Sequence, residues 1–286
     1  MDDDIAAAVA ARLAGLPPLR ETIAAHDLDA RKRLGQHFLL DLNLTRRIAR
    51  AAAPLSPGTV IEVGPGPGGL TRALLLEGAT HVVAIEVDRR AITALQELQQ
   101  AAAGHLQVIE GDALEIDLAT LGPSPRRIVA NLPYNVSTAL LVRWLHAAGD
   151  VAEMVLMFQK EVVDRLVAVP RTKDYGRLSV LAQHVCSVQR LFDVAPSAFV
   201  PPPKVTSSVA RLRPKPAGDR LADLRPLERL TAAAFGQRRK MLRGALAGLF
   251  TDPTAILTGL GLAPTARAEE LTVAEFVRLA GALTIE

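Results

Sequence analysis

The chain has 286 residues, 49% of them hydrophobic and 22% charged, and its formal net charge is +3. This is the composition of a globular protein, and the single cysteine, Cys186, excludes an internal disulfide and a zinc site built on cysteines. No apolar run reaches the ~18 residues that span a membrane, and the opening MDDDI is acidic where a signal peptide is basic. We therefore expect a cytoplasmic protein without a membrane partner or a metal site.

The first elements along the chain are helical. An amphipathic pattern predicts a helix over 2–14, which the sequence GLPPLR ends. A basic segment, ARKRLGQHFLL, follows and contains Arg31, Lys32 and Arg33. Asp41 then stands where an N-cap residue is preferred, so a second helix is expected to begin directly after it.

Strand and helix patterns alternate after this point. Apolar runs predict strands over 59–63, 81–87, 106–111, 127–132 and 152–158. Amphipathic runs predict helices over 69–77, 88–104, 137–149, 160–169 and 177–185, and a closing β pair over 187–194 and 207–214. Strands joined by helices indicate a mostly parallel α/β sheet with right-handed crossovers.

The remainder of the chain is rich in alanine and leucine and has no strand pattern. RPKPAGD, just after the closing β pair, has the composition of a linker. The sequence therefore predicts an N-terminal helical extension over 1–29, an α/β domain over 30–215 and a small all-helical domain over 216–286.

A glycine-rich turn, VIEVGPGPGGLT, follows the first strand of the sheet and opens a helix. Gly64, Gly66 and Gly69 match the G-x-G-x-x-G dinucleotide pattern in its usual context. Glu86 ends the next strand, where an acidic residue binds ribose hydroxyls. These features are compatible with both NAD and S-adenosylmethionine, because both molecules contain an adenosine.

Neighbouring residues favour S-adenosylmethionine over NAD. Pro65 and Pro67 remove backbone N–H groups that a pyrophosphate would need. Glu62 places a carboxylate where it can face an ammonium or sulfonium charge, and Asp112, after the third strand, can accept a hydrogen bond from the adenine amine. The alternative is structural: Glu62 in a salt bridge, and Glu86 and Asp112 as turn or cap residues.

The fourth strand runs into the sequence VANLPYNVST, at the sheet edge where open α/β folds carry their chemistry. The amide oxygen of Asn131 and a carbonyl of the rigid Leu132-Pro133 link can accept hydrogen bonds from an exocyclic amine and so favour its pyramidal, nucleophilic form. Tyr134 offers a face on which a flipped-out base can stack. The alternative is a turn in which Asn131 caps, Pro133 shapes and Tyr134 packs.

Basic residues are unevenly distributed. The stretches 194–218 and 229–251 contain no acidic residue beside their cations. Those cations, together with the basic segment near residue 31, predict a surface for a polyanion, although each group could also be a solvated helix face. The candidate RNA-binding residues are Arg31, Lys32, Arg33, Lys204, Arg238, Arg239, Lys240 and Arg243.

In order, the motifs RKRLGQHFLLD, VIEVGPGPGGLT, AIEVD, EGDAL, VANLPYNVST, FQKEVVDRL, YGRLSVLAQ, PSAFVPPPKVTSSVARL and AFGQRRKMLR resemble the KsgA (RsmA) family of small-subunit ribosomal RNA adenine dimethyltransferases. The resemblance covers about 30–280. It implies a Rossmann-like class I methyltransferase fold with a closing antiparallel strand and a helical C-terminal domain. SAFVPPPKV and FGQRRK are closer to this branch than to the related Erm enzymes.

The resemblance also implies residue roles. Tyr134 and Phe199 would sandwich the target adenine, although Phe199 also has the pattern of a core aromatic beside a proline run. Asn131 would touch both the methyl donor and the target amine. The implied cofactor residues are Gln36, His37, Leu39, Gly64, Gly66, Glu86, Asp112 and Asn131. The family usually has asparagine at position 37, and because an imidazole changes charge near neutral pH, we expect a cofactor affinity whose pH dependence differs from that of His37→Asn.

The function implied is transfer of two methyl groups from S-adenosylmethionine to N6 of each of two adjacent adenines in a hairpin near the 3′ end of small-subunit rRNA. The partner would be the assembling small ribosomal subunit, and we expect a monomer. Three alternatives stay open: an Erm-like enzyme acting on large-subunit rRNA, a non-catalytic assembly or transcription factor, and a dehydrogenase. The intact Asn-Leu-Pro-Tyr sequence argues against the non-catalytic alternative.

Overall fold

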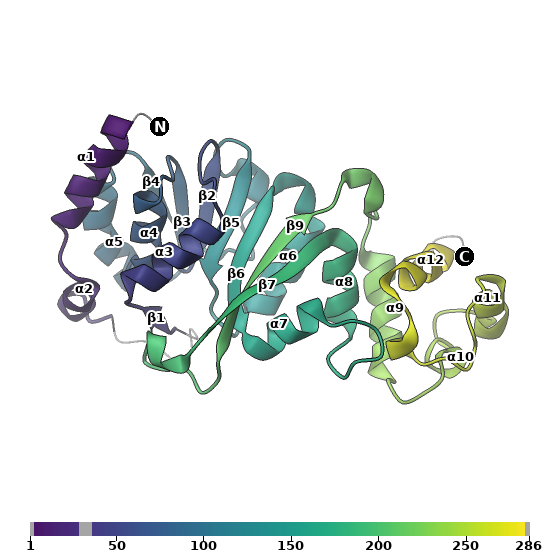
Figure 1. The fold of residues 1–286 in the computed structure, drawn as a ribbon. Helices are drawn as coiled ribbons and strands as arrows, with labels where there is room; N and C mark the ends of the chain where they lie inside the picture. Colours follow the sequence, from purple (N-terminus) through teal and green to yellow (C-terminus); the bar gives the residue numbers. More distant parts are fainter. Residues whose placement is uncertain (1–2, 29–35, 284–286) are drawn as a thin grey trace. The chain divides into compact units, whose positions relative to one another are not determined.

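The computed structural model describes residues 3–28 and 36–283 (Figure 1). The predicted RNA-binding residues Arg31, Lys32 and Arg33 lie outside the described residues. The chain divides into two compact units. The first comprises 1–160 and 190–213, and the second comprises 161–189 and 214–286.

The first unit is built on the predicted sheet, whose strand order is β4-β3-β2-β5-β6-β9-β7. The strands from β4 to β6 are parallel, and β9 is antiparallel to β6, which confirms the mostly parallel sheet with an antiparallel closing strand. The strand bounds are β2 Thr59–Val63, β3 Val82–Glu86, β4 Leu106–Glu110, β5 Arg126–Asn131, β6 Glu153–Gln159, β7 Cys186–Val194 and β9 Ser207–Pro214.

Helices cover the sheet because its central strands are apolar on both faces. Every residue of β2 and β3 is buried, as expected for a parallel strand between two layers. Apolar side chains of α1, α3, α4 and α5 form one cluster with one face of the sheet. The helix bounds are α1 Asp3–Ala14, α2 Leu19–Ala25, α3 Leu42–Ala51, α4 Gly69–Leu76, α5 Arg89–Ala101 and α6 Ser137–His146.

Two aspartates cap helices that were predicted from the sequence. The Asp41 Oδ1 atom accepts a hydrogen bond from the backbone N–H of Asn43 at 2.8 Å, before α3. Asp88 Oδ1 accepts one from the Arg90 N–H at 3.1 Å, before α5. Each carboxylate satisfies a donor that the helix itself leaves unpaired.

The strand order creates a crevice between β2 and β5. After β2 the chain moves outward to β3 and β4, and it returns to place β5 on the other side of β2. The loops that follow β2 and β5 therefore diverge in opposite directions, which is the topological switch point where α/β proteins bind ligands. The glycine turn follows β2, and Asn131 is the last residue of β5.

A separate two-stranded ladder joins distant parts of the first unit. β1 (Phe38–Leu39) pairs antiparallel with β8 (Phe199–Val200), with Phe38 opposite Val200 and Leu39 opposite Phe199. This ladder ties the segment of the predicted cofactor residues to the proline-rich loop that follows Phe199.

The second unit is helical, as predicted for the C-terminal part of the chain. Its core includes the buried rings of Tyr175 and Phe276, which contact the half-buried Phe235 ring at centroid distances of 5.9 and 5.4 Å. The segment 161–189 belongs to this unit, whereas it was predicted to be part of the α/β domain. The helices are α7 Lys160–Val167, α8 Arg177–Val185, α9 Arg225–Gly236, α10 Leu242–Ala245, α11 Pro253–Gly259 and α12 Val273–Leu283.

The described residues also form short 3-10 turns: η2 Leu118–Thr120, η3 Ala148–Asp150, η4 Pro196–Ala198, η5 Ala217–Asp219 and η6 Ala268–Glu270. None of the helices in the described part of the chain has the length and apolar character needed to cross a membrane.

Candidate active site

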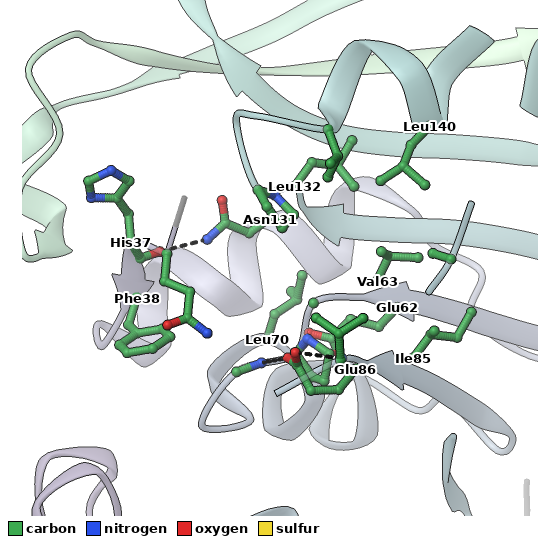
Figure 2. Close-up of a pocket in the computed structure, with 18 of the residues that line it drawn as sticks. His37, Phe38, Glu62, Val63, Leu70, Ile85, Glu86, Asn131, Leu132 and Leu140 are labelled. Atoms are coloured by element: carbon green, nitrogen blue, oxygen red, sulfur yellow. Dashed lines mark hydrogen bonds between the residues drawn. The ribbon is translucent and has the colours of Figure 1, made fainter. Parts of the chain in front are cut away.

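A pocket opens at the carboxyl ends of β2, β3 and β5, at the switch point (Figure 2). Every residue that the sequence analysis assigned to the cofactor lines it, together with the Asn-Leu-Pro-Tyr stretch. The lining is Gln36, His37, Phe38, Leu39, Glu62, Val63, Gly64, Pro65, Gly66, Pro67, Gly69, Leu70, Ile85, Glu86, Val87, Gly111, Asp112, Ala113, Asn131, Leu132, Pro133, Tyr134, Asn135, Val136 and Leu140.

The glycine turn forms the floor of this pocket against Phe38. Gly66 has a φ of +54°, and a Cβ atom placed on it would lie 2.9 Å from the Phe38 ring. A side chain there would both strain the backbone and collide with the aromatic ring. Phe38 was not among the predicted site residues, because nothing local in the sequence shows that a residue so far from the turn packs on it.

Glu86 is held by the backbone that surrounds it. Its Oε2 accepts a hydrogen bond from the Gly66 N–H at 3.2 Å (Figure 2). Its Oε1 accepts from the N–H groups of Val87 and Asp88, both at 2.9 Å. Burial raises the pKa of this carboxyl, while the three N–H donors oppose that rise. Glu86 therefore shapes the turn, and its remaining acceptor capacity faces a pocket that would suit a ribose diol.

Glu62 is fully buried beneath the turn and forms no salt bridge with any residue that the structure describes. The Thr71 hydroxyl donates to its Oε2 at 2.6 Å. Burial raises the pKa of Glu62 to about 8, against the opposing effect of the Thr71 bond. A cation entering the pocket would favour the ionised carboxylate.

Asp112 has the structural role and keeps one oxygen free for the predicted one. Its Oδ1 accepts a hydrogen bond from the Leu114 N–H at 2.9 Å, which is the turn role considered as the alternative. The side chain is exposed and lines the pocket, so Oδ2 stays available to an amine.

Gln36 and Leu39 lie on the opposite wall. The Gln36 side-chain amide donates to Asp88 Oδ2 at 3.3 Å, which links the segment before β1 to the start of α5. Leu39 is buried, and the Cβ atom of a residue at position 69 would lie 2.6 Å from its carbonyl oxygen. The glycine turn and β1 are therefore packed at backbone contact distance.

Asn131 is oriented by a backbone carbonyl. Its Nδ2 lies 3.0 Å from the carbonyl oxygen of His37, as Figure 2 shows. A carbonyl oxygen can only accept, so the amide nitrogen must face it and Oδ1 must point elsewhere. No donor among the described residues reaches Oδ1, which leaves this oxygen for a ligand in the pocket.

The aromatic residues that were predicted to hold a base lie around His37. The His37 ring is 5.3 Å from the Tyr134 ring and 6.4 Å from the Phe199 ring, centroid to centroid. Phe199 is only 2% exposed and does not line the pocket, so its ring is buried in this structure, and its role in base binding stays a prediction. The Tyr134 hydroxyl is 2.6 Å from Ser207 Oγ, and burial raises the pKa of Tyr134. No sequence pattern indicated Ser207, which comes from β9.

The predicted RNA-binding cations differ in their surroundings. Lys204, Arg239, Lys240 and Arg243 are exposed and form no ion pair with any residue that the structure describes. Arg238 instead bonds Glu269 Oε2 at 2.7 Å and donates to the Thr172 carbonyl at 3.0 Å. Its charge is therefore compensated within the second unit.

In the described ranges 3–28 and 36–283, no group of three or more His, Cys, Asp or Glu side chains is arranged to hold a metal ion.

Comparisons with known proteins agree with this geometry. Residues 27–284 match the family described as Ribosomal RNA adenine dimethylase. A protein of Rhodospirillum rubrum named Ribosomal RNA small subunit methyltransferase A is 58% identical over 283 residues, which are 99% of this chain and 98% of that protein. A protein of the same name from Paramagnetospirillum magneticum is 59% identical over 271 residues, 95% of this chain and 96% of that one.

Solved structures show the same architecture. A dimethyladenosine transferase from Plasmodium falciparum superposes with a TM-score of 0.76 at 27% identity, covering 87% of this chain and 98% of that one. The 23S rRNA methyltransferase ErmE superposes with a TM-score of 0.62 at 26% identity, covering 86% of this chain and 99% of that one.

Proposed function

The chain belongs to the ribosomal RNA adenine dimethylase family, and from this premise we propose that it binds S-adenosylmethionine in the pocket between β2 and β5 and dimethylates N6 of adenines in small-subunit rRNA. The observation that carries the proposal is the orientation of Asn131, whose free amide oxygen faces a pocket lined by the predicted cofactor residues.

The donors and acceptors of the pocket suit this cofactor. Glu86 would hold the ribose hydroxyls, the exposed oxygen of Asp112 would accept from the adenine amine, and Glu62 would face the cationic methionine part. Pro65 and Pro67 leave few backbone N–H groups for a pyrophosphate, which argues against NAD. The cofactor supplies an electrophilic methyl group.

The protein's part in the transfer is to position the acceptor amine. In the first transfer, Asn131 Oδ1 and the carbonyl of the Leu132-Pro133 link accept hydrogen bonds from the two N–H groups of an adenine amine, and in the second transfer one of them accepts from the N–H that remains. These bonds favour the pyramidal nitrogen, whose lone pair points toward the methyl group. The amine releases one N–H proton to solvent for each methyl group that it gains. An amide does not titrate in the working pH range, so Asn131 acts by electrostatic positioning and not as a general base.

Tyr134 supplies the face on which the flipped-out adenine stacks. Phe199 closes the other side of the base after the surrounding side chains rearrange. The exposed cations Arg239, Lys240 and Arg243 contact phosphates of the rRNA, and the helical second unit docks on the assembling small subunit. The acceptors are two adjacent adenines in a hairpin near the 3′ end of that RNA.

The strongest competing function is methylation of large-subunit rRNA, which the likeness to ErmE keeps open. The two functions are separated by offering undermethylated small subunits and large-subunit rRNA as competing acceptors with labelled S-adenosylmethionine. The proposal expects label in the small subunit, whereas label mainly in large-subunit rRNA would reject it.

The cofactor is tested independently of the acceptor. Calorimetric titration is expected to give saturable binding of S-adenosylmethionine and no binding of NAD, and Asp112→Ala should weaken the former about tenfold, the loss of one good hydrogen bond to a charged acceptor. Tight binding of NAD would support the dehydrogenase alternative.

A further inference from the structure

His37 contacts both rings of the predicted base-binding pair. Its imidazole is tilted by 34° to the Tyr134 ring at 5.3 Å and meets the Phe199 ring edge-on, at 81° and 6.4 Å. The ring therefore touches the two side chains that would sandwich the target adenine.

A hydrogen bond holds this imidazole in place. His37 Nδ1 lies 2.8 Å from the carbonyl oxygen of Pro201, in the loop after β8. Because that carbonyl only accepts, Nδ1 carries the proton and donates. The ring is thus fixed by two aromatic contacts and one directional bond, and its side chain is only partly exposed.

We propose that the His37 imidazole occupies, in the protein without RNA, part of the position that the target adenine takes between Tyr134 and Phe199, and that it swings out when the base enters. The inference rests on the proposed function, since it presumes an adenine as acceptor. It assigns His37 a role in base entry that is separate from cofactor binding.

The chemistry of the ring supports this role. An imidazole has the planar five-membered ring that is one half of a purine, so it makes the same kind of stacking and edge contacts as the base that displaces it. A slot between two aromatic rings that stayed open to water would leave apolar surface exposed, and the imidazole covers that surface.

The backbone of His37 can stay in place while its ring moves. The next residue, Phe38, is fixed in the ladder with Val200, and the His37 carbonyl holds the Asn131 amide. Rotation about the side-chain bonds of His37 would break only the Pro201 bond and the two ring contacts. The catalytic amide would therefore remain oriented during base entry.

Displacing the imidazole must weaken apparent RNA affinity, because the base replaces contacts that already exist. Removing the ring should therefore tighten substrate binding. The expected fall in KM is about three- to tenfold, the range set by the removal of one aromatic pairing and one hydrogen bond.

The test measures KM for undermethylated small subunits at saturating S-adenosylmethionine. It compares wild type with His37→Ala, which removes the ring, and His37→Phe, which keeps a ring. His146→Ala, an exposed histidine on α6 outside the pocket, is the matched control. We expect KM to fall for His37→Ala, to stay at or above the wild-type value for His37→Phe, and to be unchanged for the control. Melting temperature and cofactor affinity are measured for each variant.

Three outcomes would overturn the inference. A higher KM for His37→Ala alone would mean that the imidazole stacks on the RNA and assists binding. A higher KM for both variants would indicate a structural role. Equal KM values for wild type and His37→Ala would mean that the ring does not compete with the base for this position. If wild type transfers no methyl group at all, the proposed function fails. If methyl transfer occurs but KM for His37→Ala is not lower than that of wild type, only the role of His37 is rejected.

The same question can be asked of the wild-type protein if a variant does not fold. The ring proton signals of His37 should be shifted by the Tyr134 and Phe199 rings in the free protein. They should move to ordinary positions when a short hairpin with two adjacent adenines is added. Signals that the saturating hairpin leaves unchanged would overturn the proposal.

Discussion

The amide of Asn131 donates a hydrogen bond from Nδ2 to the backbone carbonyl of His37, across 94 positions of sequence, at 3.0 Å. This bond decides which end of the amide faces the pocket. A carbonyl partner accepts only from the nitrogen, so the oxygen faces the pocket, and no donor among the described residues bonds to it.

Exchanging that nitrogen for oxygen should therefore lower kcat as much as deleting the side chain does. In Asn131→Asp, a carboxylate oxygen would face the His37 carbonyl oxygen. Because both oxygens are acceptors and repel each other, the carboxylate would turn away from this position. We expect kcat to fall about 10²–10³-fold, the scale of losing one preorganised hydrogen-bonding group, while cofactor affinity changes much less. Single-turnover methyl transfer and cofactor titration measure the two effects. A variant that retains wild-type kcat would show that the amide's orientation is irrelevant.

The contact between Gly66 and Phe38 can be tested with a matched pair of glycines. Gly66 and Gly104 both have positive φ, but a Cβ atom meets Phe38 at 2.9 Å in the first case and nothing within 4 Å in the second. Gly104→Ala should cost about 1 kcal/mol of unfolding free energy, from the backbone alone, and leave cofactor affinity unchanged.

Gly66→Ala should cost about 1–3 kcal/mol more and also weaken cofactor binding, because Phe38 must move. Chemical denaturation and calorimetry provide the two measurements. Equal losses of unfolding free energy in the two variants would show that Phe38 moves aside without a measurable loss of stability.

The sheet was predictable because its signals are local. Strands β2 and β3 are continuous apolar runs, and Asp41 and Asp88 stand directly before the helices that they cap. The order of the elements then allows one simple arrangement, with helices as the crossovers of a parallel sheet. The placement of the glycine turn beside Asn131 follows from that topology.

The contacts that orient the site were not predictable in the same way. Asn131 and His37 meet only after folding, and so do Phe38 and Gly66. Phe199 has the sequence context of a base-binding residue, yet its burial depends on the ladder between β1 and β8. Arg238 belongs to a basic run, but its pairing with Glu269 depends on a distant segment.

Glu62 should make stability depend on pH. Burial raises its pKa to about 8, whereas the unfolded chain releases this proton near pH 4.5. The folded protein therefore holds a proton that the unfolded chain has released across this window. The stability contribution is complete below about pH 4.5 and declines as the pH rises toward about 8.

Glu62→Gln removes this proton and keeps an acceptor for Thr71. From pH 5 to pH 8 the wild type should lose about 1–4 kcal/mol relative to this variant. At pH 7, binding of the cationic cofactor should release a proton from wild type and not from Glu62→Gln, as calorimetry in buffers of different ionisation enthalpy detects. Parallel stability curves and equal proton release would contradict the buried, protonated Glu62.

RNA affinity should fall steeply with salt, because cations that bind phosphates release counterions. Replacing the exposed Arg239, Lys240 and Arg243 by glutamine should reduce the slope of log affinity against log salt by about 0.7–0.9 for each phosphate that is no longer neutralised. Arg278→Gln, an exposed arginine on α12, serves as the control. Filter binding from low to moderate salt gives the slopes, and a slope that the triple variant does not change would mean that these cations face solvent.

The central claim is tested most directly by the modified nucleoside itself. Undermethylated small subunits are incubated with S-adenosylmethionine and either wild type, Asn131→Ala or Asn43→Ala, an exposed asparagine on α3 that does not line the pocket. The RNA is then digested and analysed by mass spectrometry. We predict N6-dimethyladenosine with wild type and Asn43→Ala, and little or none with Asn131→Ala. Absence of the nucleoside with wild type, despite binding of cofactor and subunit, would contradict the account and indicate a binding protein with an enzyme's fold.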